Sequence, residues 1–89
     1  MMYPYMTLWD GTEVVHSDIR ENDQVYVHFE RPVDLPDRAF DEATCVLPEY
    51  EWKERIGYSD DEMALWDQYV RSNAHLFYKY AACGGIKIA

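Results

Sequence analysis

The amino-acid sequence predicts an α+β fold, in which an antiparallel sheet is covered on one face by a long C-terminal helix. Three observations support this class. Short β-favouring runs in the first half are separated by turn residues, and residues 60–83 show a helical apolar period. The chain is also 48% hydrophobic and 16% aromatic, which excludes a disordered chain. We therefore expect one domain over residues 1–89 with a four-stranded meander of about residues 3–9, 12–19, 25–30 and 39–47.

The first three strands follow from turn chemistry and alternation. Asp10-Gly11 is a strong two-residue hairpin signal between the first two strands. In the third strand, Val25, Val27 and Phe29 alternate with polar residues. Pairing the second and third strands so that residue numbers sum to 44 brings their apolar sides together, and it places His16 opposite His28 on the outer face.

Prolines divide the middle of the chain. Pro32 and Pro36 predict a loop over residues 32–36, because proline cannot donate a hydrogen bond to a strand ladder. The sheet is then expected to resume over residues 39–47. Pro48 suits the first position of a helix, so the sequence predicts a short helix over residues 48–56.

The long helix has clear start and stop signals. Ser59 and Glu62 have the spacing of a capping box, in which each side chain bonds the other residue's backbone. Gly84 and Gly85 provide the C-terminal stop. The sequence therefore predicts a helix over residues 60–83, packed on one sheet face.

Composition excludes several function classes. Seventeen acidic residues against eight basic ones give a net charge of −9, which disfavours direct binding of nucleic acid or of an anionic membrane. No apolar run is long enough to cross a bilayer, and the N-terminus lacks the pattern of a secretory signal. Cys45 and Cys83 have no metal-motif spacing, so we expect free thiols and a cytoplasmic setting.

Catalytic patterns are missing from the sequence, so we expect a protein that is not an enzyme and needs no cofactor. It has no glycine-rich phosphate loop, and no serine lies in a nucleophile elbow. Under the predicted register, His16 and His28 are weak candidates for a metal site, with Asp18 and Glu30 among their neighbours. The simpler interpretation is a polar pair on a solvated sheet face.

Acidity is the main functional lead, and it is concentrated in the middle of the chain. Residues 34–67 contain eleven acids and three bases, whereas residues 68–89 contain three bases and no acid. A band of carboxylates imitates the phosphate charges of nucleic acid and binds basic channels. Solubility is the alternative explanation. The residues predicted to bind a partner are Asp34, Asp37, Asp41, Glu42, Glu49, Glu51, Glu54, Asp60 and Asp61.

Several stretches resemble a group of small uncharacterised acidic proteins from mobile elements of gut anaerobes. These stretches are residues 3–8, 13–17, 43–48 and 73–76, the last leading to Gly84-Gly85. The resemblance implies no activity and no residue role. In size, acidity and setting, the chain is also similar to anti-CRISPR and anti-restriction proteins as a class, without a shared motif.

The sequence therefore predicts a non-enzymatic inhibitor or accessory protein that binds a basic, nucleic-acid-handling protein through a nucleic-acid-mimicking surface. Two alternatives stay open. One is an antitoxin or a homo-oligomer, such as a homodimer, that uses an aromatic sheet surface while acidity serves solubility. The other is a metal-binding domain that uses the two histidines.

Overall fold

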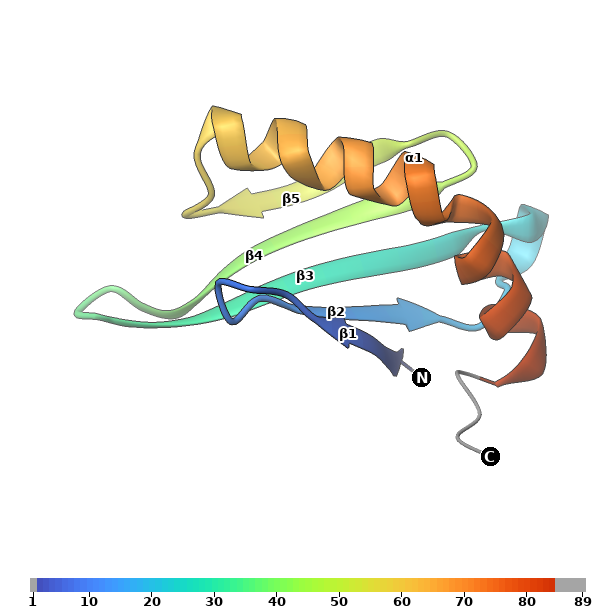
Figure 1. Cartoon of the computed structure of the whole chain (residues 1–89), viewed down its shortest axis with the longest axis horizontal. Coiled ribbons are helices and arrows are strands. Elements are labelled where there is room, and N and C mark those ends of the chain that lie inside the picture. The colour runs from blue at the N-terminus through green and yellow to red at the C-terminus, as the bar shows by residue number, and fades with distance from the viewer. Residues whose placement is uncertain (1, 85–89) are drawn as a thin grey trace.

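A computed structural model describes residues 2–84 as one antiparallel sheet, a short 3-10 turn (Glu21–Asp23) and one long helix. Neighbouring strands in the sheet are also neighbours in the chain, so the sheet is a simple meander (Figure 1). The strands are β1 (Met2–Thr7), β2 (Glu13–Ser17), β3 (Val25–Leu35), β4 (Arg38–Leu47) and β5 (Glu51–Ile56). Helix α1 (Asp60–Cys83) lies across one face of this sheet, which confirms the α+β class.

Helix α1 begins and ends where the sequence predicts. The Ser59 hydroxyl accepts a hydrogen bond from the Glu62 backbone N–H at 3.2 Å, and the Glu62 carboxylate accepts one from the Ser59 N–H at 3.0 Å. This reciprocal pair is the predicted capping box. Gly84 closes the helix in the left-handed region, with a φ of 78°. Gly85, the second predicted stop residue, lies outside the described residues.

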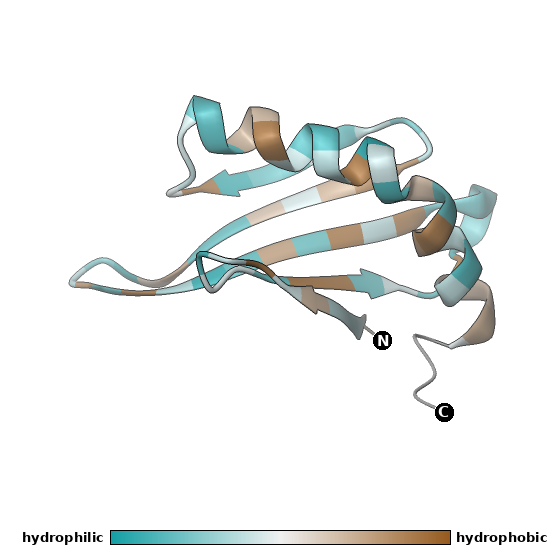
Figure 2. Cartoon of the chain, viewed as in Figure 1, coloured by the Kyte–Doolittle hydropathy of each residue, from teal (hydrophilic) through white to brown (hydrophobic). Residues whose placement is uncertain are grey.

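The core lies between α1 and the sheet face that it covers. Four helix residues at helical spacing are buried there: Trp66, Val70, Phe77 and Ala81. From the sheet, Phe29 stacks on Trp66 with ring centroids 5.4 Å apart. Figure 2 shows the matching pattern along β3, where apolar and polar bands alternate. Because this alternation has a period of two residues, the opposite face of the sheet is more polar.

The predicted short helix over residues 48–56 is wrong, since residues 51–56 form a fifth strand. The chain turns at residues 48–50, where Tyr50 has a positive φ of 56°, and then pairs with β4. Contacts of Trp52 stabilise this strand against the core. Its ring lies 5.7 Å from that of Phe29, and its Nε1 donates to Asp67 at 3.1 Å. These contacts are distant in sequence, so proline position alone could not predict them.

The predicted loop over residues 32–36 is also wrong. β3 continues to Leu35 and pairs with β4 up to Arg38, with an irregularity in register after Pro32. β2 accompanies β3 only as far as Glu30. Beyond that point β3 has one partner strand, so its other side requires no ladder hydrogen bond and a proline is tolerated. The result is a two-stranded hairpin that projects from the sheet (Figure 1).

The first two strands are shorter than predicted, and the register of β2 against β3 differs by one residue. Val14 lies opposite Phe29 and His16 lies opposite Val27, so paired residue numbers sum to 43. A shift of one residue exchanges the two faces of a strand. Val14 and His16 therefore face the core, whereas Val15 lies on the outer face. The prediction counted Val15 and Ile19 together as the apolar side of a strand over residues 12–19, but β2 ends at Ser17 and does not include Ile19.

Candidate functional site

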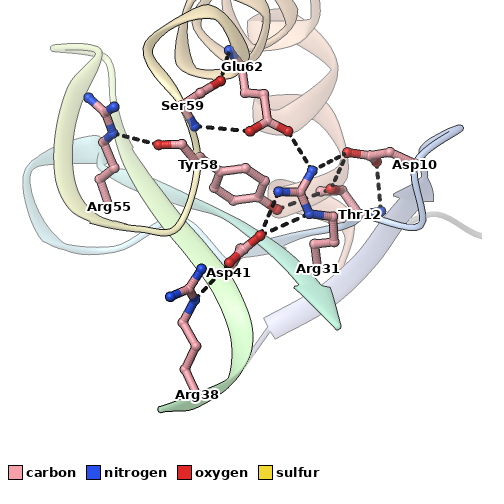
Figure 3. Close-up of polar contacts among 9 residues, drawn as sticks. All are labelled: Asp10, Thr12, Arg31, Arg38, Asp41, Arg55, Tyr58, Ser59 and Glu62. Atoms are coloured by element: carbon pink, nitrogen blue, oxygen red, sulfur yellow. Dashed lines mark hydrogen bonds and ion pairs between the residues drawn. The ribbon is translucent and has the colours of Figure 1, made fainter. Parts of the chain in front are cut away.

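A partly buried ionic cluster lies at the N-terminal end of α1 and is centred on Arg31 of β3 (Figure 3). The Arg31 guanidinium donates to Asp10 from the β1–β2 turn, to Asp41 from β4 and to Glu62 from α1. Its planar fork suits several carboxylates at once. The guanidinium carbon also lies 4.8 Å from the centre of the Tyr58 ring. One arginine thus joins four segments that are far apart in the chain.

The carboxylates of this Arg31 cluster are held in their charged form. Burial alone would raise the pKa of Asp41, but hydrogen bonds from Arg31 and Arg38 outweigh burial and lower it. The hydrogen bond from Arg31 lowers the pKa of Glu62, and the same bond raises the pKa of Arg31. For Asp10, burial is outweighed by hydrogen bonds from Thr12 and Arg31, so its pKa is also lowered. The cluster is therefore internally compensated, as in a structural ion-pair network.

Asp41 does not join the partner-binding surface that the sequence predicts. Its side chain is only 3% exposed and pairs with Arg31 and with Arg38, the latter at 2.9 Å. Asp41 also leaves no room beside Gly57, because a Cβ at Gly57 would overlap its Oδ1 atom. Its role in the structure is internal, which its position in the sequence did not reveal.

His16 and His28 lie on opposite faces of the sheet, so the predicted metal pair does not form. His16 is fully buried and its Nδ1 donates to the Ser17 carbonyl at 2.9 Å, while its Nε2 has no partner. The rings of Tyr3, Tyr5 and Phe77 surround it. His28 lies on the other face, where its Nδ1 is 2.8 Å from the Thr44 hydroxyl. The one-residue register shift described above separates the two.

The sheet face opposite α1, which we call the open face, carries a row of carboxylates. Glu13 pairs with Glu30 across β2 and β3, and Glu30 pairs with Glu42 across β3 and β4. All three are on the open face, because their chain neighbours Val14, Phe29 and Ala43 are buried in the core. No element among residues 2–84 covers this face (Figure 1). We call the three glutamates the glutamate row.

The only base that contacts the glutamate row within the described residues is a histidine. His28 Nε2 lies 3.9 Å from Glu30 and 3.7 Å from Glu42. Their side chains are about a third exposed, at 35% and 36%. Like charges directly opposite on adjacent strands destabilise a sheet. The row therefore presents carboxylates to solvent with few basic groups to neutralise them. This arrangement is suited to binding positively charged side chains of another molecule.

The other predicted acids do not gather on one surface. Glu51 and Glu54 of β5 lie opposite Val46 and Thr44, so they extend the acidic character of the open face. The remaining exposed residues are at the tip of the projecting hairpin (Asp34, Asp37), in the turn before β5 (Glu49) and at the start of α1 (Asp60, Asp61). Asp60 pairs with Arg55 at 2.6 Å. Of the predicted residues, the open face therefore brings together Glu42, Glu51 and Glu54.

Glu13 and Glu30 were missed by the sequence-based prediction. Both lie outside the acid-rich segment of residues 34–67, so a count of charge along the chain does not select them. They meet only because the strands are paired in the observed register. Correct strand pairing would have been the necessary signal.

Within residues 2–84, the two cysteines lie in different environments and no metal-binding cluster is found. Burial raises the pKa of the Cys45 thiol to about 12, so this cysteine is an unreactive core residue. Cys83 is exposed and unpaired in the structure. Over residues 2–84, no three His, Cys, Asp or Glu side chains are placed to hold a metal ion. The same residues contain no helix that is long and apolar enough to span a membrane.

Comparison with known proteins gave no match to a family model, to a curated protein or to a solved structure.

Proposed function

We propose that this protein is a non-enzymatic inhibitor or accessory protein that binds a basic, nucleic-acid-handling protein through the open face. The observation that carries this proposal is the glutamate row, in which Glu13, Glu30 and Glu42 are aligned across three strands. Carboxylates at strand spacing, about 4.8 Å, form a line of negative charge comparable to a phosphate backbone. Anti-CRISPR-like or anti-restriction-like inhibition would follow from occupying the partner's nucleic-acid site.

The arrangement is costly to the isolated protein, which supports a role in binding. Each opposed like-charge pair destabilises the sheet by up to about 1 kcal/mol, and the row contains two such pairs. Solubility alone does not require this alignment, because dispersed exposed acids serve it equally well. A basic partner would replace the repulsion with charge-assisted hydrogen bonds.

The test is affinity capture from a host lysate over a range of salt concentrations and with competing DNA. We expect recovery of a basic nucleic-acid-binding protein that both salt and DNA displace, because screening weakens exposed charge pairs. The variant E13Q/E30Q/E42Q should lose this partner. A matched control, E21Q/D34N/D61N, removes the same charge from exposed positions outside the row and should retain it. If both variants lost the partner equally, binding would depend on net charge and not on the glutamate row, which would contradict the proposal.

A second candidate, an antitoxin or homo-oligomeric module, is favoured by one apolar patch next to α1. Trp9, Met6 and Leu65 are 76%, 52% and 49% exposed. Trp9 packs against Trp66 with ring centroids 5.7 Å apart, and Tyr69 contacts Met6. Exposed tryptophan and methionine are enriched at protein interfaces. Sedimentation of the wild type and of Trp9→Ala in low and high salt tests this candidate, which requires a salt-resistant oligomer that Trp9→Ala dissociates.

A further inference from the structure

The glutamate row continues to an apolar residue on the edge strand. Ile56 of β5 lies directly opposite Glu42, so the register across β2, β3, β4 and β5 reads Glu13, Glu30, Glu42 and Ile56. Ile56 is 46% exposed. The line therefore presents three carboxylates and then one exposed apolar side chain, on a sheet face that no described element covers.

The spacing of this line matches an α-helix and does not match an extended chain. Strands lie about 4.8 Å apart, so the four positions fall at about 0, 4.8, 9.6 and 14.4 Å. Helix residues i, i+3, i+7 and i+10 share one side and rise to about 0, 4.5, 10.5 and 15 Å. Same-side residues of an extended strand fall at about 0, 6.7 and 13.4 Å, so they are out of step with the row from the second position onward.

We infer that the open face binds a basic amphipathic helix of a partner protein, laid across the strands. This inference rests on the proposed function and names the partner's form. Its Arg or Lys residues at i, i+3 and i+7 would pair with Glu13, Glu30 and Glu42, and an apolar residue at i+10 would pack on Ile56. Phe40 adds exposed apolar surface beside the row, since it is 42% exposed and lies two residues from Glu42 on the same strand and face.

The charges on the rest of the open face restrict where such a helix lies. Beside the row, a shallow hollow is lined by seven residues that include two cations and one carboxylate: Met2, Arg20, Tyr26, His28, Thr44, Lys53 and Glu54. The hollow is therefore less acidic than the glutamate row, so we expect the basic side of the helix to lie on the row, where three carboxylates are aligned. Long arginine side chains accommodate the small differences in spacing between helix and sheet.

The test uses the full chain and two synthetic peptides of about 20 residues, both held helical by side-chain bridges on one face. The patterned peptide has Arg at positions i, i+3 and i+7 and Leu at i+10. The permuted peptide has the same composition with its Arg residues distributed around the helix. Binding is measured by calorimetry at low salt. We expect the patterned peptide to bind at least about tenfold more tightly, because three paired charges act together.

Two variants locate the complex. E13Q/E30Q/E42Q should abolish the preference for the patterned peptide, whereas the control E21Q/D34N/D61N should preserve it. Ile56→Gln should weaken binding of the Leu peptide several-fold and leave a peptide with Gln at i+10 unaffected. Circular dichroism establishes that each variant is folded.

Equal affinity for the two peptides would overturn the inference. If the lysate experiment still recovered a basic partner that depends on the glutamate row, the proposed function would stand and only the helical form of the partner would be rejected. Loss of the preference in the control variant as well would also overturn it, because the open face would then have no special role.

Discussion

The Arg31 cluster and the glutamate row contain the same number of carboxylates and differ in what neutralises them. Asp10, Asp41 and Glu62 surround one guanidinium, and Arg38 adds a second cation to Asp41. Among residues 2–84, the glutamate row has only His28 as a basic contact, at 3.7 Å or more. The first set is compensated inside the fold, and the second is left for solvent or a partner. The net charge of −9 therefore includes acids of two different kinds.

This comparison separates stability from binding. Removal of a charge should destabilise the fold in the Arg31 cluster and should stabilise it in the glutamate row. Four measurements test the contrast, from the largest expected effect to the smallest.

Arg31→Met should lower the free energy of unfolding by about 3 to 5 kcal/mol. The reason is that Asp41, which is 3% exposed, would lose its central partner and stay charged in a buried position. Urea unfolding followed by circular dichroism measures the change. Lys53→Met is the control, because the Lys53–Glu51 pair is exposed and should contribute less than about 1 kcal/mol. Equal effects in the two variants would contradict a central role for Arg31.

Gly57→Ala should destabilise the protein more than Gly11→Ala by about 2 kcal/mol. Both glycines have a φ of 87°, so alanine at either position would be held in the same strained range of φ. At Gly57 the added Cβ would also overlap the Asp41 carboxylate and approach Arg38, whereas at Gly11 it would meet no atom of the described residues within 4 Å apart from its chain neighbours. The difference between the two thermal or urea transitions therefore measures how rigidly the Arg31 cluster is held. Identical transitions would show that the cluster moves aside without cost.

Acid should weaken the Arg31 cluster. Asp10, Asp41 and Glu62 have pKa values lowered from 3.8, 3.8 and 4.5, so the unfolded chain binds more protons than the folded one. Their contribution to stability is complete above these ordinary values and is lost as pH falls through the lowered ones. Urea titrations at pH 7 and at steps below pH 4.5 should show this decline. In Glu62→Gln the decline should be shallower, and an unchanged slope would exclude Glu62 from the effect.

E13Q/E30Q/E42Q should raise the free energy of unfolding by about 0.5 to 1 kcal/mol at neutral pH and low salt. The substitution removes two opposed like-charge pairs and keeps side chains of similar size. Added salt should reduce the gain, because it screens the repulsion in the wild type. A loss of stability would mean that the glutamate row is compensated like the Arg31 cluster, and the contrast between them would fail.

Local signals in the sequence determined the helix and the class of the fold. The capping pair Ser59 and Glu62, the helical apolar period and Gly84 act within a few residues, so the predicted range of 60–83 agrees with α1 (Asp60–Cys83). Alternation likewise predicted the core-facing residues of β3, which are Val25, Val27 and Phe29. A turn between the first two strands was also predicted correctly, although it spans residues 8–12 and is longer than the predicted two-residue hairpin loop at Asp10-Gly11.

Tertiary structure alone decided the rest, because strand pairing depends on contacts between distant segments. Trp52 made residues 51–56 a strand by packing on Phe29, and the free side of β3 beyond Glu30 allowed the hairpin through Pro32. A one-residue difference in register buried His16 and aligned Glu13 with Glu30. Strand register decides which acids are paired within the fold and which face outward. Counting charge along the chain could not separate these two groups of acids.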